Sequence, residues 1–380
     1  MTKKILIVTE RRADYSKFRP IIRRIQESNK LDYYLVVTGS HLLNEHGNTI
    51  NEIKKDGFKI KSKFLMYKKT KNDTGAEMIL SLSRAIQKLT PIIDKLKPDL
   101  ILSGFDIGAN FAASMIGAHM NIPVAHVEGG EVTGTIDEPI RHSISKFSHL
   151  HFTTNKKAKS RLIKMGENPK FIFNVGNSSL DEIIKLKNIS REKISSQFKL
   201  DPKKPYIVIL QHTVTSEIDS VERFIKETLN AVMELDIQAI LIHGNADAGG
   251  KRISKIFKNY KIKQFNALSF EQYINLLKHS SALVGNSSSG IMEAPFLKIP
   301  SINIGTRQTG RLRQKSIIDV DYNKTQIKKA IKKALYDKRF LSQIRRQDKP
   351  YGSGHASEKI VKILEKIDLK KIPIQKRLTY

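Results

Sequence analysis

The chain of 380 residues contains no cysteine and no tryptophan. Without cysteine it can form no disulfide, offer no thiolate nucleophile and build no cysteine-based zinc site. This composition fits a reducing compartment, and we expect a cytoplasmic protein. The N-terminal stretch MTKKILIVTERR has too short an apolar run for a signal peptide. No uncharged run approaches the roughly 18 residues needed to cross a bilayer, so we expect no membrane association.

Acidic residues are scarce beside basic ones: 37 Asp and Glu stand against 67 Lys and Arg, which gives a formal net charge of +30. Such a charge attracts polyanions. The basic residues are nevertheless spread along the whole chain, and no zinc-finger, RNP or basic-zipper pattern accompanies them. Charge alone gives only salt-sensitive, sequence-independent affinity, so we predict no specific nucleic-acid partner. A basic surface suits a small phosphorylated substrate equally well.

Short apolar runs alternate with longer segments of helical period, which is the pattern of βαβ units in a parallel sheet. The predicted strands are residues 4–10, 33–40, 99–104, 122–129, 149–154, 206–213, 237–245, 281–290 and 299–305. A polar stretch with Pro202 and Pro205 separates the first five from the last four. Length and pattern together predict two doubly wound α/β domains of about 170 residues each.

Polar side chains follow most of the predicted strands. Ligands of such sheets bind beyond the carboxyl ends of the strands, so the polar groups there are candidate site residues. They are Arg11, Arg12, Asp14, Ser16, Asp106, Glu128, Gln211, His212, Asn245 and Asn286–Gly290. We expect the two sets to face each other across a cleft between the domains, where ligand pockets tend to lie.

The densest group of ionisable residues is the stretch HVEGGEVTGTIDEPIRH, residues 126–142, which follows a predicted strand. Its four carboxylates are those of Glu128, Glu131, Asp137 and Glu138. Thr135 and Glu138 have the spacing of a capping box, which predicts a helix start and gives Glu138 a structural role. The other three carboxylates, with Asp106 at the neighbouring strand end, form a candidate acid/base site, because carboxylates held close together have shifted pKa values.

The stretch SALVGNSSSGIMEAPF predicts a phosphate site. A strand ends at Gly285, serines follow, and a helix is expected to start near Gly290. Free backbone N–H groups and the positive helix end bind phosphate there without a lysine. Glu293 in the first turn could accept both hydroxyls of a ribose. The alternative is an N-capping serine with a first-turn acid, and the sequence leaves both open.

Two further patterns carry less information. The loop HGNADAGGK, residues 243–251, lacks the spacing of a P-loop. His212 at a strand end can donate a hydrogen bond to a phosphate or a leaving group, although a lone histidine is more often structural. No HExxH or similar ligand set is present, so we predict neither a metal nor a cofactor.

Long strings of the sequence carry a resemblance to one family. These are, in chain order, RADYSK (12–17), GSHLLNEHGNTI (39–50), HVEGGEVTGTIDEPIRHSISKFSHLHF (126–152), LQHTVTSE (210–217) and GNSSSGIMEAPFLKIPSINIGTRQTGR (285–311). They are similar to the hydrolysing UDP-N-acetylglucosamine 2-epimerases. The resemblance implies the GT-B architecture, in which two Rossmann-like domains hold the active site in the cleft between them. It places the domains at residues 1–178 and 200–355, with a helix at about 356–380 that returns to the first domain. It also implies a homo-oligomer, either a dimer or a tetramer.

The same resemblance implies roles for individual residues. The UDP-binding set would be Arg12, Ser16, His212, Asn245, Leu268, Ser287, Ser288, Glu293 and Arg307. The catalytic set would be Asp106, Glu128 and Asp137, with Glu131 adjacent and His212 on the diphosphate. One departure matters, because many family members have Gly-Asp-Arg where this chain has GFDIG. Asp106 is present, but Ile107 replaces the arginine, so one phosphate contact must come from elsewhere.

The implied reaction converts UDP-N-acetylglucosamine and water into N-acetylmannosamine and UDP, a step of sialic-acid-type sugar biosynthesis. Elimination of UDP would give a 2-acetamidoglucal, which water then hydrates with inversion at C2. Two alternatives stay open. One is the same reaction on UDP-2,4-diacetamido-2,4,6-trideoxyglucose, on the legionaminic acid route. The other, from a different class, is a basic nucleic-acid-binding protein.

Overall fold

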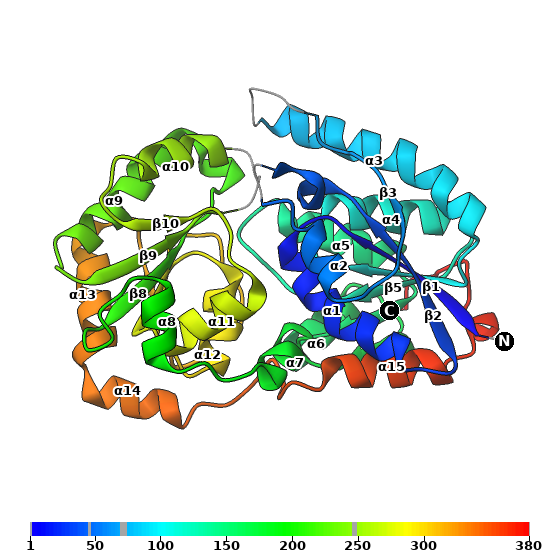
Figure 1. Ribbon diagram of the computed structural model, residues 1–380. Helices are drawn as coiled ribbons and strands as arrows, with labels where there is room; N and C mark the ends of the chain where they lie inside the picture. The colour runs from blue at the N-terminus through cyan, green and yellow to red at the C-terminus, as the bar shows by residue number, and fades with distance from the viewer. Residues whose placement is uncertain (1, 45–46, 69–73, 245–248, 380) are drawn as a thin grey trace.

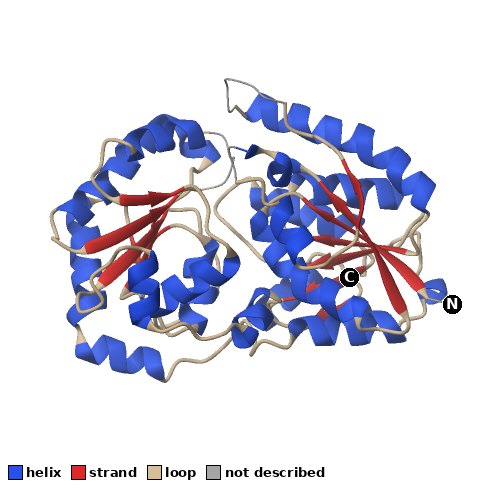
Figure 2. Ribbon diagram, in the orientation of Figure 1, coloured by secondary structure: helices blue, strands red, loops and turns tan. Residues whose placement is uncertain are grey.

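The computed structural model describes residues 2–44, 47–68, 74–244 and 249–379, which form two parallel sheets with helices on both faces (Figures 1 and 2). The first sheet contains, in spatial order, β3 (Ile60–Lys63), β2 (Leu31–Val37), β1 (Lys3–Thr9), β4 (Leu100–Gly104), β5 (Val124–Val127), β6 (Leu150–Thr153) and β7 (Ile172–Asn174). The second contains β10 (Lys263–Phe265), β9 (Gln238–Ile242), β8 (Tyr206–Leu210), β11 (Ala282–Gly285), β12 (Ser301–Ile304) and β13 (Ile317–Val320). This confirms the predicted pair of doubly wound α/β units.

Most of the described helices lie in the crossovers between parallel strands, whereas two connect the sheets and three follow the last strand, β13. The described helices are α1 (Arg12–Gln26), α2 (Ile50–Lys55), α3 (Gly75–Leu96), α4 (Gly108–His119), α5 (Asp137–Phe147), α6 (Lys156–Lys164), α7 (Ser179–Lys185), α8 (Arg191–Gln197), α9 (Val221–Met233), α10 (Gly250–Phe257), α11 (Phe270–His279), α12 (Glu293–Phe296), α13 (Lys324–Tyr336), α14 (Lys338–Arg345) and α15 (Ala356–Lys366). Among the described residues, no helix is both long and apolar enough to cross a membrane.

All nine predicted strands are present, and four strands were not predicted. The four are β3, β7, β10 and β13, which are the edge strands of the two sheets. An edge strand is covered on fewer sides than a central one, so its sequence does not need a continuous apolar run. In β3 the pattern is IKSK, whereas the central β4 reads LILSG and is buried throughout.

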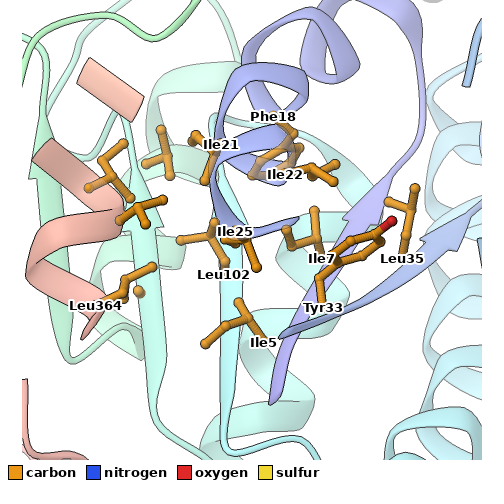
Figure 3. Close-up of a cluster of buried hydrophobic side chains, with 14 of the residues drawn as sticks. Ile5, Ile7, Phe18, Ile21, Ile22, Ile25, Tyr33, Leu35, Leu102 and Leu364 are labelled. Carbon is orange, nitrogen blue, oxygen red and sulfur yellow. The ribbon is translucent and has the colours of Figure 1, made fainter. Parts of the chain in front are cut away.

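The central strand β1 shows how the sequence builds the first core. Ile5 and Ile7 point to one face of the sheet, where they meet the apolar stripe of α1 (Figure 3). Leu6 and Val8 point to the other face and pack in a cluster with side chains of α3 and α4. Each such side chain, fully removed from water, contributes about 1.5–3 kcal/mol. Burial on both faces explains why the strand reads as one apolar run.

The C-terminal helix α15 packs against α1 of the first sheet. Ile360 and Leu364 of α15 belong to the same buried cluster as Ile21 and Ile25 of α1 (Figure 3). The Lys3 ammonium donates hydrogen bonds to the last carbonyls of α15, at 2.9 Å to Leu364 O and at 3.1 Å to Glu365 O. The chain therefore builds the second sheet and then returns to the first one (Figure 1).

Candidate active site

A pocket lies between the two sheets, at the carboxyl ends of their strands. The loops after β1 and β4 enter it from the first sheet, and those after β8 and β11 from the second. In each sheet these two strands are neighbours, β1 beside β4 and β8 beside β11. The earlier strands continue outward on one side of the pair, and the later strands continue outward on the other side. Such a switch point leaves a crevice, because the crossovers on its two sides lie on opposite faces of the sheet.

The pocket contains most of the residues that the sequence singled out. The predicted residues that line it are Arg12, Ser16, Asp106, Asp137, His212, Leu268, Ser287, Ser288, Glu293 and Arg307. Two predicted carboxylates, Glu128 and Glu131, are buried outside the lining. Asn245 lies outside the described residues. Among the residues that are described, no three His, Asp or Glu side chains are grouped so that they could hold a metal ion.

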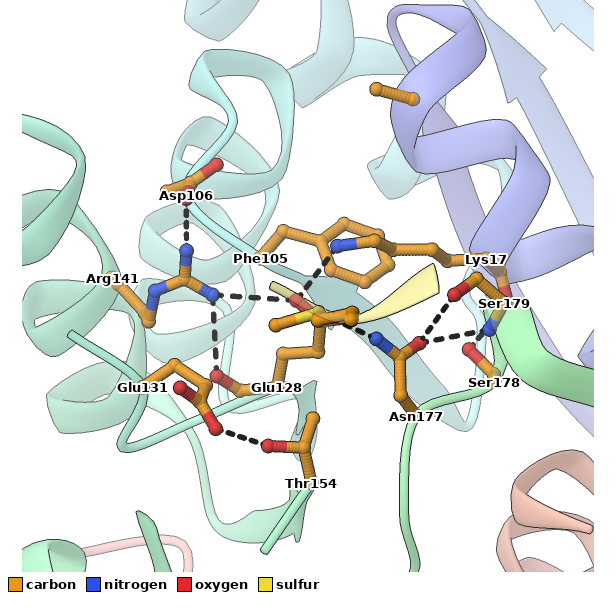
Figure 4. A network of polar contacts seen from close by, with 12 residues as sticks. Lys17, Phe105, Asp106, Glu128, Glu131, Arg141, Thr154, Asn177, Ser178 and Ser179 are labelled. Atoms are coloured by element: carbon orange, nitrogen blue, oxygen red, sulfur yellow. Dashed lines mark hydrogen bonds and ion pairs between the residues drawn. The ribbon is translucent and has the colours of Figure 1, made fainter. Parts of the chain in front are cut away.

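Arg141 of α5 ties two of the carboxylates together (Figure 4). Its side chain is only 1% exposed. One terminal nitrogen, Nη2, donates to the Asp106 carboxylate, and the other, Nη1, lies 3.6 Å from Glu128 Oε2. Charge-assisted bonds of this kind fix both partners, because the guanidinium is planar and its donors have a fixed geometry. Arg141 therefore sets the relative position of Asp106 and Glu128.

The pKa of Asp106 reflects these neighbours. Burial alone would raise it, but the positive charges of Arg141, Arg11, Lys17 and Arg311 outweigh burial, and the pKa lies below its ordinary value. Asp106 is therefore an ionised carboxylate at neutral pH. A negative group at this end of the pocket can stabilise a developing cation or accept a proton.

Glu128 lies behind the pocket wall that Lys17 and Arg141 form. Its backbone has a φ of +64°, an unusual conformation for a residue with a side chain. One oxygen, Oε2, accepts a 2.8 Å bond from Lys17 Nζ. The other, Oε1, is buried and has no hydrogen-bond partner within the described part of the chain. A buried carboxylate oxygen with open lone pairs is costly unless a ligand uses it, and such strained positions cluster at functional sites.

Asp137 begins α5 and forms an ion pair between the two halves. Its Oδ2 lies 3.6 Å from Nη2 of Arg307, which follows β12 in the second sheet. Nη1 of Arg307 in turn donates to Asn286 O at 3.3 Å. Both side chains line the pocket. The third carboxylate thus reaches the pocket from α5 and is held by an arginine of the opposite wall.

Glu131 points away from this group. Its carboxylate accepts a hydrogen bond from the side chain of Thr154 (Figure 4) and another from the side chain of Asn155. Asn155 caps α6 by accepting from Ala158 N at 2.9 Å. Glu131 therefore holds the connection from β6 to α6 in the described structure and makes no contribution to the pocket lining.

The predicted capping box at the start of α5 does not form. The Glu138 carboxylate accepts from Thr133 N at 2.7 Å, and Thr135 Oγ1 accepts from Asp137 N at 3.2 Å. The helix itself begins at Asp137. The prediction of a Thr135–Glu138 box is wrong, because the loop folds back and brings Thr133 rather than Thr135 within reach of Glu138. Glu138 still has a structural role.

The serine loop after β11 forms the opposite wall. A 3₁₀ turn covers Ser288–Gly290, and the α-helix that follows, α12, has only four residues. Helical structure does start near Gly290 with Glu293 in the first turn of α12, as predicted, but a 3₁₀ turn precedes the α-helix. Ser287 Oγ accepts from Ser289 N at 3.3 Å. Gly285 has a φ of +136°, and a Cβ there would lie 2.1 Å from Leu210 O, so only glycine allows the loop to leave the sheet in this way.

Glu293 and His212 complete this wall. Glu293 accepts a 2.6 Å bond from Ser179 Oγ of α7, and burial raises its pKa. The backbone N–H of His212 donates to Asn286 Oδ1 at 2.7 Å, and its carbonyl accepts from Asn286 Nδ2 at 2.9 Å. The His212 ring packs on Gly244, where a Cβ would lie 2.9 Å from Nδ1. These contacts fix both side chains at the pocket.

Arg12 bridges the pocket from the other side. It begins α1, and its guanidinium donates to the carbonyl of Leu268 before α11 in the second half. Burial lowers the pKa of this arginine. Its position, opposite the serine loop and in one pocket with it, suits a group that binds an anion.

Of the pocket residues that were not predicted as site residues, four contribute to the charge and hydrogen bonding of the site. They are Lys17, Arg141, Tyr273 and Arg311. Three of them are cations in a chain that has 67 Lys and Arg residues, so their type gave no signal. The spacing of Arg141, four residues after Asp137 on a predicted helix, does indicate a shared face. Tyr273 donates to Ser289 Oγ at 2.6 Å, a long-range contact that no local pattern encodes.

Comparison with known proteins agrees with this geometry. A family model described as UDP-N-acetylglucosamine 2-epimerase matches residues 23–365. The chain is 34% identical over 373 residues to the hydrolysing UDP-N,N'-diacetylbacillosamine 2-epimerase of Legionella pneumophila, with 97% of each chain covered. It is 35% identical over 336 residues to the UDP-N-acetylglucosamine 2-epimerase of Neisseria meningitidis serogroup B, with 87% of each covered.

A solved structure shares the fold. The UDP-GlcNAc 2-epimerase of Neisseria meningitidis bound to UDP-GlcNAc superposes with a TM-score of 0.80 at 20% identity, over 96% of this chain and 100% of that one. This likeness confirms the GT-B architecture that the resemblance implied. Because the family model spans most of the sequence and both relatives exceed 30% identity over most of their length, this chain belongs to the UDP-N-acetylglucosamine 2-epimerase family.

Proposed function

We propose that this protein is a hydrolysing 2-epimerase that converts UDP-N-acetylglucosamine and water into N-acetylmannosamine and UDP. The observation that carries the proposal is that Asp106 and Asp137 line one pocket opposite the serine loop, while Glu128 is buried behind its wall and joined to Asp106 through Arg141. Membership of the family supports the nucleotide-sugar substrate. The names of the relatives from Legionella pneumophila and Neisseria meningitidis support epimerisation at C2.

The chemistry explains why such a site needs both anion binders and several carboxylates. The hydrogen on C2 of an N-acetylhexosamine is barely acidic, because no carbonyl is attached to that carbon. Stretching of the C1–O bond to UDP gives C1 oxocarbenium character and makes the C2 hydrogen acidic. The enzyme must therefore stabilise the departing diphosphate before a base can act. We assign this task to Arg12, His212, Ser287 and Ser288, together with Asn245.

The carboxylates then act as the general base and the general acid. One removes the C2 proton, which gives a 2-acetamidoglucal and UDP. Water adds to C1 while an acid on the opposite face of the ring protonates C2, so the configuration at C2 is inverted. Base and acid must lie on different faces, which is why one carboxylate is not enough. Asp106 and Glu128 come from neighbouring strand ends of the first sheet, whereas Asp137 comes from α5 beside Arg307.

Replacement of single carboxylates tests this assignment. We expect Asp106→Asn, Glu128→Gln and Asp137→Asn each to lower kcat at least 100-fold, since general acid–base catalysis contributes roughly 10²–10⁴-fold. UDP affinity should stay within about threefold of the wild type, because none of the three carboxylates is among the groups assigned to the diphosphate. Glu131→Gln is the matched control, since Glu131 lies three residues from Glu128 but binds Thr154 and Asn155 rather than Arg141, and it should retain activity. Steady-state UDP release and calorimetric UDP binding give the two readouts.

The substituents at C4 and C6 of the sugar define a second candidate substrate, UDP-2,4-diacetamido-2,4,6-trideoxyglucose. It is favoured by the name of the Legionella relative, whereas the Neisseria relative at nearly equal identity is named for UDP-N-acetylglucosamine. Parallel measurement of kcat/KM on both UDP-sugars decides between them. If kcat/KM for one UDP-sugar exceeds that for the other by more than about tenfold, the preferred sugar is the substrate. A preference for UDP-N-acetylglucosamine would assign the enzyme to sialic-acid-type biosynthesis.

We also propose that the domain limits are residues 1–178 and 200–355, with the segment 356–380 joined to the first domain. The packing of α15 on α1 supports this division. The homo-oligomer that the family resemblance implies is part of the same proposal. Sedimentation of the full chain, compared with its 43.2 kDa mass, tests that part.

A further inference from the structure

Arg311 lines the pocket but has no role in the reaction described so far. It lies after β12, and its side chain is only 7% exposed. Its Nε donates to the carbonyl of Val132 at 2.9 Å, across to the loop that follows β5 in the first sheet. Its terminal nitrogen Nη1 is buried and has no hydrogen-bond partner among the described residues.

The other arginines of this part of the pocket have carboxylate partners. Arg141 is paired with Asp106 and Glu128, and Arg307 is paired with Asp137. No ion pair within the described residues involves Arg311. A buried guanidinium without a counter-charge costs several kcal/mol, at least about 3. Such a group favours binding of an anionic ligand. The ligand would supply both the negative charge and the hydrogen-bond acceptor that the guanidinium lacks.

The sequence identified a deficit that this residue can fill. The family resemblance implies an arginine directly after Asp106, and this chain has Ile107 there. Ile107 and Arg311 line the same pocket. The Arg311 charge also contributes to the lowered pKa of Asp106, which places it within electrostatic range of the reacting carboxylates. The pocket therefore has no arginine at position 107 but contains a buried arginine with one open donor, Nη1 of Arg311.

We propose that Arg311 binds the diphosphate of the UDP-sugar through its Nη1 group. This inference rests on the proposed function, since it assumes a nucleoside diphosphate in the pocket. When the C1–O bond breaks, negative charge grows on the departing β-phosphate. A donor already in place at that oxygen stabilises the transition state more than the ground state, so Arg311 contributes to kcat as well as to binding.

Calorimetric titration of UDP and of uridine into full-length variants tests the proposal. Arg311→Gln should weaken UDP binding by about tenfold or more, since a charge-assisted bond to phosphate is lost. Uridine affinity should stay within about twofold of the wild type, because uridine lacks the diphosphate. Arg311→Lys keeps the charge and should lose less UDP affinity than Arg311→Gln. Turnover of the UDP-sugar should fall with UDP affinity across the series.

Arg313→Gln is the matched control. Arg313 lies on the same loop, pairs with Asp319 at 2.9 Å and does not line the pocket, so its loss disturbs the loop without removing the proposed contact. It should leave the UDP to uridine affinity ratio unchanged. Thermal unfolding of each variant confirms that it is folded at the assay temperature, and Arg311→Met replaces Arg311→Gln if the latter does not fold.

Two results would overturn the inference. One is a UDP affinity within about twofold of the wild type in a folded Arg311 variant that lacks the positive charge. The other is an equal loss of UDP and uridine affinity, which would indicate a structural role. Failure of the wild-type protein to bind UDP or to release it from a UDP-sugar would instead refute the proposed function. The wild-type titration therefore comes first and separates the two failures.

Discussion

At the scale of single residues, the site depends on one buried arginine. Arg141 neutralises two carboxylates, and it keeps the pKa of Asp106 low although burial acts to raise it. The two effects oppose each other, so the ionisation of Asp106 at working pH is a property of the pair rather than of the aspartate alone. Lys17, which contacts Glu128 Oε2 at 2.8 Å, compensates part of the same negative charge.

Replacement of Arg141 should change the pH profile in a defined direction. In the variant Arg141→Gln the largest charge that lowers the Asp106 pKa is gone, so burial raises that pKa. Asp106 then becomes protonated at a higher pH, and the acidic limb of kcat/KM should move to higher pH. Arg141→Lys keeps a charge and should move the limb less. A profile of unchanged shape in Arg141→Gln, with only its height reduced, would show that Asp106 ionisation does not limit activity.

Glu128 and Glu131 show how much of the site could be predicted from the sequence. Glu128 and Glu131 lie three residues apart in one glycine-rich stretch, and both are acidic, buried and next to a strand. Only the turn in the backbone at Glu128, with its φ of +64°, sends one toward Arg141 and the other toward Thr154. The sequence could supply the candidates, but no local pattern encodes that divergence.

At the scale of elements, α5 connects the site to the end of the chain. Its first turns carry Asp137 and Arg141, and its last carbonyls are held by Lys376 from the C-terminal tail. Lys376 Nζ donates to Ser145 O at 3.1 Å and to Lys146 O at 3.0 Å. It also pairs at 2.6 Å with the buried Glu167. A cation at a helix C-terminus opposes the negative end of the helix dipole. Because the helix has only 11 residues, about 16 Å, a shift at one end reaches the other.

Removal of the Lys376 side chain should therefore affect both stability and turnover. We expect Lys376→Met to cost about 1–2 kcal/mol in the free energy of unfolding, since Glu167 stays buried with fewer partners. We also expect kcat to fall severalfold at a temperature where the variant is folded, with UDP affinity unchanged. Lys371→Met is the control on the same tail, because Lys371 is 84% exposed. Denaturant unfolding and steady-state kinetics check this, and a kcat equal to the wild type in folded Lys376→Met would mean that the tail does not position α5.

The elements themselves divide into those that the sequence predicts and those that it does not. Strands buried on both faces are long apolar runs, and all nine predicted ones are of this kind or nearly so. The edge strands β3, β7, β10 and β13 are short and mixed, because they satisfy fewer packing demands. The helix after β11 differs for another reason. A 3₁₀ turn covers Ser288–Gly290, and α12 has only four residues, which is too short for a periodic apolar pattern.

At the scale of the whole molecule, neither half contains the complete site. Arg12 reaches from α1 to Leu268 in the second half, Arg307 reaches back to Asp137, and Ser179 of α7 donates to Glu293. The acid/base groups belong to the first sheet and the serine loop belongs to the second. The proposed reaction needs both, since leaving-group departure and proton removal must occur on the same sugar.

Proton NMR of the reaction in D2O, with each of the two UDP-sugars, measures the proposed chemistry most directly. We expect UDP and a free mannose-configured sugar that carries deuterium at C2, because the proton removed from C2 exchanges with solvent before the other face is protonated. A product that keeps the glucose configuration, or one that keeps its original hydrogen at C2, would contradict the proposed elimination and rehydration.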